Sequence, residues 1–280
     1  GSLVGCVFED CSSDNGGSVY WANDDGVMSG CSFVNSHADN NGGAVYWAGD
    51  NGYMYNVTIF NASSNSKYGS EANGGAIYIS GSNGNFNNIT IASSSSNNNN
   101  PANSNTANGG AIYVSGKTNA FTNVTIDDSQ ASSVRMDANG GAIYWEGHCG
   151  TINGTRFENN RVLGLGDGIE LEVKTNPDTN VQEKRYNVTG GDGGAIKWTG
   201  SHGIIENTTF YNNIAEYNGG AVYLIGNATE NCTNITFIDC NFTLNLAKLN
   251  GGAVYWAKGS SNATVNGTYF DNNTAKRSAG

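Results

Sequence analysis

The sequence predicts an all-β protein, specifically a right-handed parallel β-helix of about nine coils with three short strands in each. Two observations support this fold: a seven-residue phrase, NGGAVYW in two copies, recurs along the chain, and a Phe or Ile follows it at a nearly constant distance of 18 residues. The phrase recurs at a minimal period of 26 residues. Self-similarity at such a period, without helical periodicity, indicates a solenoid. The phrase begins at Asn15, Asn41, Asn73, Asn108, Asn139, Asp192, Asn218 and Asn250.

Two strands of each coil are predicted from apolar columns that stand five and two positions before the Phe or Ile. Leu3 and Cys6 precede Phe8 in this way, and Met28 and Cys31 precede Phe33. Between the two columns every coil has Gly, Asn or Asp, residues that tolerate left-handed backbone angles, so we expect a turn there. The turn column contains Gly5, Gly30, Asn56, Asn88, Asn123, Gly154, Asn207, Asp239 and Gly267.

The NGG phrase is predicted to form the third strand of the coil. Alternate residues of a strand share a face, so its Val or Ile and its final residue should point inward together. The residue between them is Tyr in seven copies and Lys197 in the eighth, which predicts that this column faces water. An outward tyrosine ladder suits sugar rings or partner proteins, and it also suits simple stacking that stabilises the sheet. The binding candidates in this ladder are Tyr46, Tyr78, Tyr113 and Tyr144.

Composition limits the function. The 280 residues include 40 Gly and 2 Pro and carry a formal charge of −11, yet 14 Tyr, 10 Phe and 5 Trp argue for a buried core rather than disorder. No Lys/Arg cluster is available to neutralise phosphates, so we expect no nucleic-acid partner. No run is long and apolar enough to span a membrane, so we expect no membrane insertion by this segment. Because the repeat is already under way at residue 1 and unfinished at residue 280, residues 1–280 are expected to be a single β-helix segment of a longer chain.

All the extra length of the chain is predicted to leave one corner of the coil. The connection from the Phe or Ile to the next phrase lengthens in four consecutive coils, at residues 60–72, 92–107, 127–138 and 161–191. Insertions on one face of a solenoid commonly mark its binding face. Within residues 161–191, the stretch IELEVKTNPDTNVQEKRYNV alternates in a strand-like way around a Thr-Asn-Pro-Asp turn. This pattern predicts a hairpin that serves either as a recognition element or as a lineage-specific decoration or packing flap. Its charged binding candidates are Glu170, Glu172, Lys174, Lys184 and Arg185.

Catalysis is not expected, and no resident cofactor or metal is predicted. Asp192, Lys197 and His202 come closest to an active-site constellation, but each also reads as a tolerated turn or surface substitution within the repeat. Acidic turn residues offer oxygen ligands for Ca²⁺, against the alternative that they are simply solvated. These acidic residues are Asp24, Asp25, Asp50 and Glu146.

The six cysteines form no C-x-x-C pair, which argues against zinc and redox motifs. Cys6, Cys31 and Cys240 stand in an inward column and are expected to be small core residues, although Cys6 and Cys31 stack on adjacent coils. Stacked parallel side chains fit disulfide geometry poorly. The pairing is left open, as is that of the turn residues Cys11, Cys149 and Cys232.

Fourteen Asn-x-Ser/Thr sequons are candidates for glycosylation in a secretory setting, and the repeat itself generates some of them. They are Asn56, Asn61, Asn88, Asn123, Asn153, Asn187, Asn207, Asn227, Asn231, Asn234, Asn241, Asn262, Asn266 and Asn272.

The paired signals GGA(I/V) and Phe-x-x-Asn resemble the repeats of chlamydial polymorphic outer-membrane proteins. The second signal is complete at Phe157–Asn160, Phe210–Asn213, Phe242–Asn245 and Phe270–Asn273, whereas Ser36, Ala62, Ser94 and Ser129 replace the Asn in other coils. The Asn/Ser/Thr-rich variant with NGGAVYW and NVTI is also similar to adhesin-like surface proteins of methanogenic archaea. These resemblances imply an extracellular, cell-surface passenger or adhesin without catalytic residues.

Three functions follow as hypotheses. The first is an adhesin or stalk segment that presents its loops to host, cell or glycan partners. The second is a subunit of an extracellular filament or surface coat, assembled by end-to-end stacking of open β-helix ends. The third is a polysaccharide lyase or hydrolase, since β-helices often carry such activities; clustered acids in a cavity would favour it.

Overall fold

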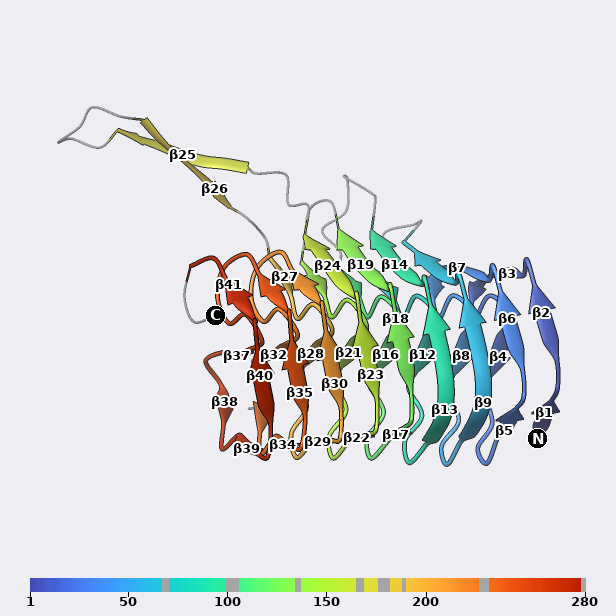
Figure 1. The fold of residues 1–280 in the computed structure, drawn as a ribbon. Helices are drawn as coiled ribbons and strands as arrows, with labels where there is room; N and C mark the ends of the chain where they lie inside the picture. The colour runs from blue at the N-terminus through green and yellow to red at the C-terminus, as the bar shows by residue number, and fades with distance from the viewer. Residues whose placement is uncertain are drawn as a thin grey trace.

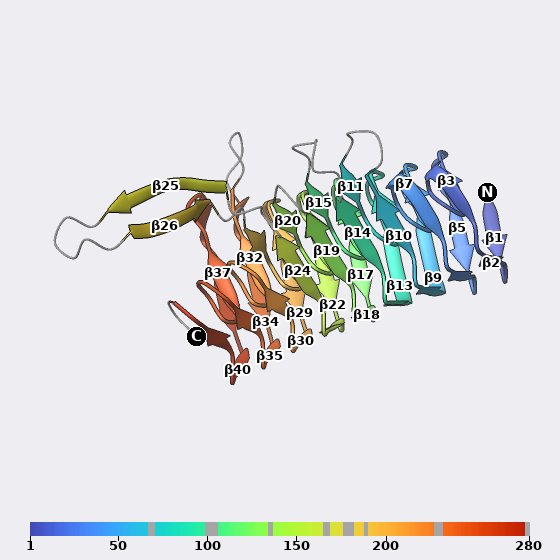
Figure 2. The ribbon, with the colours of Figure 1, turned by 90° about the horizontal axis from the view of Figure 1, so that it is seen from above.

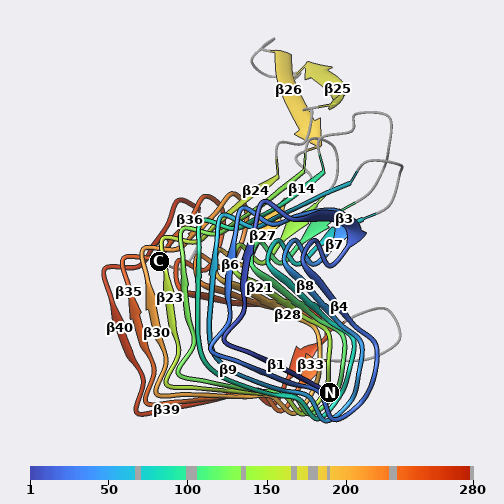
Figure 3. The same ribbon diagram turned by 90° about the vertical axis from the view of Figure 1, so that its right-hand side faces the viewer.

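The computed structural model describes residues 1–66, 71–98, 106–133, 137–164, 169–175, 182–187, 190–226 and 232–277, with backbone alone at 169–175, 182–187 and 232. Every regular element in these ranges is a β-strand, and the strands stack coil on coil into a rod (Figure 1). Viewed along the rod, successive coils lie one behind another with a progressive sideways offset (Figure 3). The predicted parallel β-helix is confirmed.

Two of the predicted strand columns form the first sheet, which has 16 parallel strands. In β9 and β13 the two strands of one coil merge into a single long strand. The sheet contains β1 (Ser2–Val4), β2 (Val7–Glu9), β5 (Val27–Ser29), β6 (Ser32–Val34), β9 (Tyr53–Phe60), β13 (Asn85–Ala92), β17 (Ala120–Thr122), β18 (Thr125–Asp127), β22 (Thr151–Asn153), β23 (Arg156–Glu158), β29 (Ile204–Glu206), β30 (Thr209–Tyr211), β34 (Thr236–Ile238), β35 (Asn241–Thr243), β39 (Thr264–Asn266) and β40 (Tyr269–Asp271).

The NGG phrases form a separate eight-stranded parallel sheet, called here the third sheet. Its strands are β4 (Val19–Trp21), β8 (Val45–Trp47), β12 (Ile77–Ile79), β16 (Ile112–Val114), β21 (Ile143–Trp145), β28 (Ile196–Trp198), β32 (Val222–Leu224) and β37 (Val254–Trp256).

The structure adds a second sheet of 13 strands, built from residues that the repeat assigned to the variable connection and to the head of the NGG phrase. These segments are rich in Ser, Asn and Ala, so they lack the alternating apolar pattern by which strands are recognised. The strands are β3 (Ser12–Asn15), β7 (His37–Asn41), β10 (Ser63–Asn65), β11 (Ala72–Asn73), β14 (Ser95–Asn98), β15 (Ala107–Asn108), β19 (Gln130–Ser133), β20 (Ala138–Asn139), β24 (Arg161–Gly164), β27 (Gly191–Asp192), β31 (Ile214–Ala215), β36 (Leu246–Ala247) and β41 (Thr274–Ala275).

Two small sheets complete the part of the chain that the structure describes. β33 (Cys232–Thr233) pairs in parallel with β38 (Ser260–Ser261). β25 (Ile169–Thr175) pairs with β26 (Gln182–Asn187) in antiparallel fashion, within the long insertion between β24 and β27. Figure 2 shows this pair drawn apart from the stacked sheets.

The core consists of columns in which like residues stack on like. Phe157, Phe210 and Phe242 pair in register, and their rings lie 5.0 and 4.5 Å apart in nearly parallel planes. Trp145 stacks on Trp198 at 4.5 Å. These side chains are fully buried. Burying such rings contributes the main favourable free energy of the fold, and offset stacking adds to it.

The predicted turn column is confirmed. All nine of its residues have a positive φ, between 48° for Asn207 and 63° for Gly5. This left-handed region is nearly closed to residues with branched or bulky side chains, which explains why the column contains Gly, Asn and Asp alone.

The two glycines of the NGG phrase are required for different reasons. Gly109 has a φ of +63°, which an L side chain rarely adopts. A Cβ at Gly110 would lie 2.0 Å from the carbonyl oxygen of Gly141 in the next coil and 2.4 Å from the backbone carbon of Gln130. The second glycine therefore sets how closely the coils and the second sheet approach, and the phrase is architectural.

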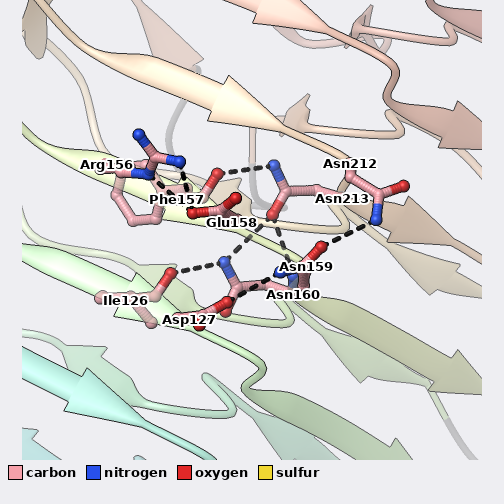
Figure 4. Close-up of polar contacts among 9 residues, drawn as sticks. All are labelled: Ile126, Asp127, Arg156, Phe157, Glu158, Asn159, Asn160, Asn212 and Asn213. Carbon is pink, nitrogen blue, oxygen red and sulfur yellow. Dashed lines mark hydrogen bonds and ion pairs between the residues drawn. The ribbon is translucent and has the colours of Figure 1, made fainter.

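The Asn of the Phe-x-x-Asn signal forms a buried ladder (Figure 4). The Nδ2 of Asn213 donates to the carbonyl oxygen of Phe157 at 3.1 Å and to Oδ1 of Asn245 at 2.9 Å. Its Oδ1 accepts from the backbone N–H of Asn160 at 3.1 Å. Asn160, Asn213 and Asn245 have no exposed surface, so each amide satisfies buried groups of a neighbouring coil.

The close approach at Gly110 makes a first prediction. Gly110→Ala should lower the free energy of unfolding by at least about 3 kcal/mol, because backbone atoms in two strands would have to move. Gly30→Asn is the control, since Gly30 meets only distant atoms and other coils have Asn in its column. Urea unfolding followed by circular dichroism measures both, and equal stability of the two variants would contradict the packing argument.

The asparagine ladder makes a second prediction. Asn213→Ala should cost about 3 kcal/mol, because it leaves the Phe157 carbonyl and the Asn160 N–H buried without their partner. Asn212→Gly is the matched control: Asn212 is exposed, has a φ of +52° that Gly accepts, and makes one exposed hydrogen bond to Asn159. A shift in the urea midpoint no larger than that of the control would show that the ladder adds little.

Candidate functional site

The tyrosine ladder runs along the face of the third sheet that points away from the core. Tyr20, Tyr46, Tyr78 and Tyr113 stack with ring centroids 4.6, 4.6 and 4.8 Å apart, and Tyr144 follows at 5.4 Å with a tilted ring. Stacking of this kind stabilises a parallel sheet without any ligand.

The prediction that this column faces water is wrong for its middle members. Tyr20 is 57% exposed, whereas Tyr113 and Tyr223 are only 7% exposed. Tyr113 donates a hydrogen bond from its hydroxyl to Oε2 of Glu146 at 2.5 Å. Pointing away from the core is not the same as facing water here, because the second sheet lies beside this face: Lys197 of the third sheet reaches Asn139 of the second.

Burial perturbs the tyrosines. It raises the pKa of Tyr78 to about 12, with the neighbouring Tyr46 adding to the effect. Burial also raises the pKa of Tyr113 and Tyr144 strongly, and the negative charge of Glu146 raises both further. The neutral phenol is therefore the form that the folded protein requires.

A charged pair interrupts two ladders in one coil. Lys197 occupies the tyrosine column, and Asp192 occupies the column of asparagines at the head of the NGG phrase, where its Cα pairs with that of Asn139. The Nζ of Lys197 lies 6.0 and 5.3 Å from the ring centroids of Tyr144 and Tyr223 and donates to Oδ1 of Asn139 at 2.6 Å. Burial lowers the pKa of Lys197 and raises the pKa of Asp192. The opposite charge of the other residue partly counteracts each shift.

The sequence pattern groups Asp192, Lys197 and His202 and predicts that all three are tolerated turn or surface positions. The structure separates them: Asp192 is buried and Lys197 half-buried, whereas His202 is exposed in a turn, with Nε2 3.0 Å from Nδ2 of Asn234. The surface interpretation is wrong for Asp192 and Lys197. The signal that identifies them is the simultaneous loss of Asn and Tyr from two columns of one phrase.

A polar hollow of about 370 Å³ lies on the outer face of the second sheet, over three successive coils. Ser95, Gln130 and Arg161 are in-register neighbours on β14, β19 and β24. The hollow arises because the side chains lengthen from Ser95 to Arg161 along the column. It is lined by Ser93, Ser94, Ser95, Asn97, Asp128, Ser129, Gln130 and Arg161.

The hollow lies where the longest insertions leave the rod. The strands β14, β19 and β24 are the first strands of the insertions 92–107, 127–138 and 161–191. The chain returns to the second sheet at β15, β20 and β27. A hollow lined by hydroxyl, amide, carboxylate and guanidinium groups offers many hydrogen bonds and few apolar contacts, which suits a hydroxyl-rich ligand such as a sugar. The sequence did not predict these residues, because their columns look like ordinary surface positions.

The charged candidates Glu170, Glu172, Lys174, Lys184 and Arg185 stand on β25 and β26, where the structure describes the backbone alone. Their binding role stays a prediction.

The acidic turn residues serve as hydrogen-bond acceptors between coils. Oδ1 of Asp24 accepts from the N–H of Asp50 at 2.8 Å, and Oδ1 of Asp50 accepts from the N–H of Ser82 at 2.7 Å. Among the residues that the structure describes, no group of three His, Cys, Asp or Glu side chains could hold a metal ion. Calcium at these turns stays a prediction.

The candidate glycosylation sites are largely accessible. Asn153 is half-buried; Asn187, Asn227 and Asn231 lie outside the described side chains. In the turn column, Nδ2 of Asn88 donates to Oδ1 of Asn56 at 2.6 Å, so these amides also form an outer ladder. Glycan occupancy stays a prediction. The remaining sites are exposed: Asn56, Asn61, Asn88, Asn123, Asn207, Asn234, Asn241, Asn262, Asn266 and Asn272.

The cysteines that the structure describes with side chains are free thiols. Cys31 and Cys240 are buried, as the inward column predicts, and burial raises the pKa of Cys240 to about 11. Over the same part of the chain, no helix has the length and apolarity that crossing a membrane needs.

Large apolar side chains are exposed on the first and last coils. Val4, Val7 and Tyr20 are exposed at one end, and Trp256 and Phe270 at the other. End-to-end association stays a prediction.

Stacked parallel coils with insertions at one edge define this chain as a β-helical repeat protein. Residues 207–224 match the Chlamydia polymorphic membrane protein repeat. The match contains Phe210 and Asn213 and the following GGAV, so it covers one complete Phe-x-x-Asn signal and one NGG strand. No curated protein and no solved structure matches the chain significantly.

The tyrosine pKa values predict a fall in stability at alkaline pH. An unfolded tyrosine loses its proton near pH 10, whereas the buried ones keep theirs to about pH 12 or above. Between these values the folded state binds more protons than the unfolded state, so the free energy of unfolding decreases as pH rises. Below about pH 10 the stabilisation is complete.

The measurement is the thermal midpoint from pH 8 to 12 for Tyr113→Phe and for Tyr20→Phe, whose side chain is exposed. The Tyr113 variant should show a shallower fall than the parent, and the Tyr20 variant the same fall. The other titrating groups are the same in the three proteins, so their contribution to the slope cancels when the variants are compared. Identical slopes in all three proteins would exclude the buried tyrosines as the cause.

Proposed function

We propose that this chain is a segment of an extracellular cell-surface adhesin or stalk, with no enzymatic activity, that binds glycan-bearing surfaces at its insertion-bearing edge. The repeat match supports a surface location, because the matched family is one of outer-membrane or surface-exposed proteins. The asparagine- and serine-rich repeat also resembles that of archaeal adhesin-like proteins, in which the same role is expected.

One observation carries the binding part of the proposal: the polar hollow at Ser95, Gln130 and Arg161 lies at the same edge as the insertions. Ser93 and Asn97 of its lining donate to Asp128 and Ser95, so part of this polar surface is ordered by its own hydrogen bonds. Here the column changes size and charge from coil to coil, which creates a shaped polar surface. A sugar ring with several hydroxyl groups matches such a surface better than an apolar ligand does.

The test is binding of the labelled chain to an immobilised panel of neutral and acidic polysaccharides. Arg161→Ala should reduce binding by about tenfold, the effect of about 1.4 kcal/mol, because a charged hydrogen-bond donor is lost from the hollow. Arg156→Ala is the matched control: Arg156 belongs to the same coil, is exposed, and forms an ion pair with Glu158 on the first sheet.

Equal loss of binding in both variants would mean that the interaction depends on overall charge and not on the hollow. Absence of binding to any glycan in the panel by the parent protein would contradict the glycan proposal.

A further inference from the structure

The asparagine ladder at the head of the NGG phrases has a regular chemistry that fails at one coil. In its regular part, Nδ2 of each asparagine donates to Oδ1 of the asparagine one coil earlier, as in Asn108 to Asn73 at 2.8 Å and Asn139 to Asn108 at 2.7 Å. The next residue in the column is Asp192, whose carboxylate has no N–H to donate. Oδ1 of Asn139 therefore loses its ladder donor.

Lys197 replaces that donor. Its Nζ lies 2.6 Å from Oδ1 of Asn139, and Asn139 is buried. The carbonyl carbon is one bond of about 1.23 Å from that oxygen, so Nζ lies at most about 3.8 Å from Cγ. This is close to the separation of about 3–3.5 Å from which a nucleophile attacks. The rings of Tyr144 and Tyr223 flank the amine on either side.

We propose that Lys197 and Asn139 form an intramolecular isopeptide bond that joins the coils on either side of the long insertion. The uncharged Lys197 amine attacks Cγ of Asn139, and a bond forms between Nζ and Cγ. The bond between Cγ and Nδ2 breaks, and a proton passes from Nζ to Nδ2, which leaves as ammonia. The reaction requires no oxidant, reductant or second substrate.

The surroundings favour each part of this reaction. Burial lowers the pKa of Lys197, which increases the fraction of uncharged, nucleophilic amine at neutral pH. Asp192, Asp137 and Glu146 are the carboxyl groups that act electrostatically on the amine. Asp192 occupies the same column as Asn139 one coil on, on the side of the Lys197 amine, and burial raises its pKa, so its carboxylate is suited to take up the proton that the attacking amine releases.

The cross-link has a mechanical consequence. The insertion 161–191 lies between Asn139 and Lys197 in the sequence. A covalent bond between these residues keeps the two parts of the rod joined even when the chain is cut within the insertion.

The first test is the intact mass of the denatured 280-residue chain, followed by fragmentation of its proteolytic peptides. The expected result is a mass lower by one ammonia and a branched peptide that contains both Asn139 and Lys197. Asn139 precedes Gly140, a sequence that can also lose ammonia by forming a succinimide, so the branched peptide decides. An unmodified mass, or ammonia lost from the Asn139 peptide alone, overturns the proposal.

The variants Lys197→Arg and Asp192→Asn provide the controls. Lys197→Arg keeps a charged donor, and Asp192→Asn restores the regular ladder, so at least one is expected to fold; both should keep the full mass. After limited trypsin cleavage at Lys184 or Arg185, the parent should run as one band on a denaturing gel and Lys197→Arg as two. Two bands for the parent would overturn the proposal. None of these results depends on glycan binding.

Discussion

The structure depends on one constraint: every coil stacks on the next in register, so each side chain meets its counterpart in the neighbouring coils. Gly110 permits this approach, because any Cβ there would collide with the carbonyl of Gly141. The columns must therefore be chemically self-complementary. Phe, Trp and Tyr satisfy this by stacking, and Asn satisfies it because its amide both donates and accepts. A column of like charges at the strand spacing of about 4.8 Å would repel itself, consistent with a chain that is only 13% charged.

The same constraint explains why Asp192 and Lys197 occur together. An aspartate in the asparagine column accepts from Asn218 but leaves Asn139 without a donor. A lysine in the adjacent tyrosine column supplies that donor and an opposite charge. Either substitution alone would bury an unpaired charge, which costs several kcal/mol. A substitution in one column of a stacked fold is thus compensated by a substitution in the column beside it. The pair also places a lysine amine against a buried asparagine amide, an arrangement that a regular ladder lacks.

Much of the fold could be predicted from the sequence, because stacking in register makes structural columns visible as sequence columns. The pairing of Phe8 with Phe33 and the left-handed turns at Asn56 and Asn88 follow from spacing and residue type. The second sheet could not be predicted, since its Ser- and Asn-rich strands have no apolar alternation. For the same reason the exposure of Tyr113 was predicted wrongly. If the second sheet is not known, a residue that points away from the core is expected to face solvent. The hollow at Arg161 depends on side-chain lengths in that sheet.

The edge that carries the insertions is the place where this fold tolerates change at least cost. Val162 at the start of the longest insertion still pairs with Ala131, and Gly191 at its end pairs with Ala138, so the ladders continue on both sides of its central part. Lengthening a connection from 13 to 35 residues adds only about 1 kcal/mol of closure entropy. A single methyl group in the glycine column costs more than that. Sequence variation can therefore accumulate beside the polar hollow while the columns stay fixed, and a covalent bond across the longest insertion would hold the rod together as that edge diverges.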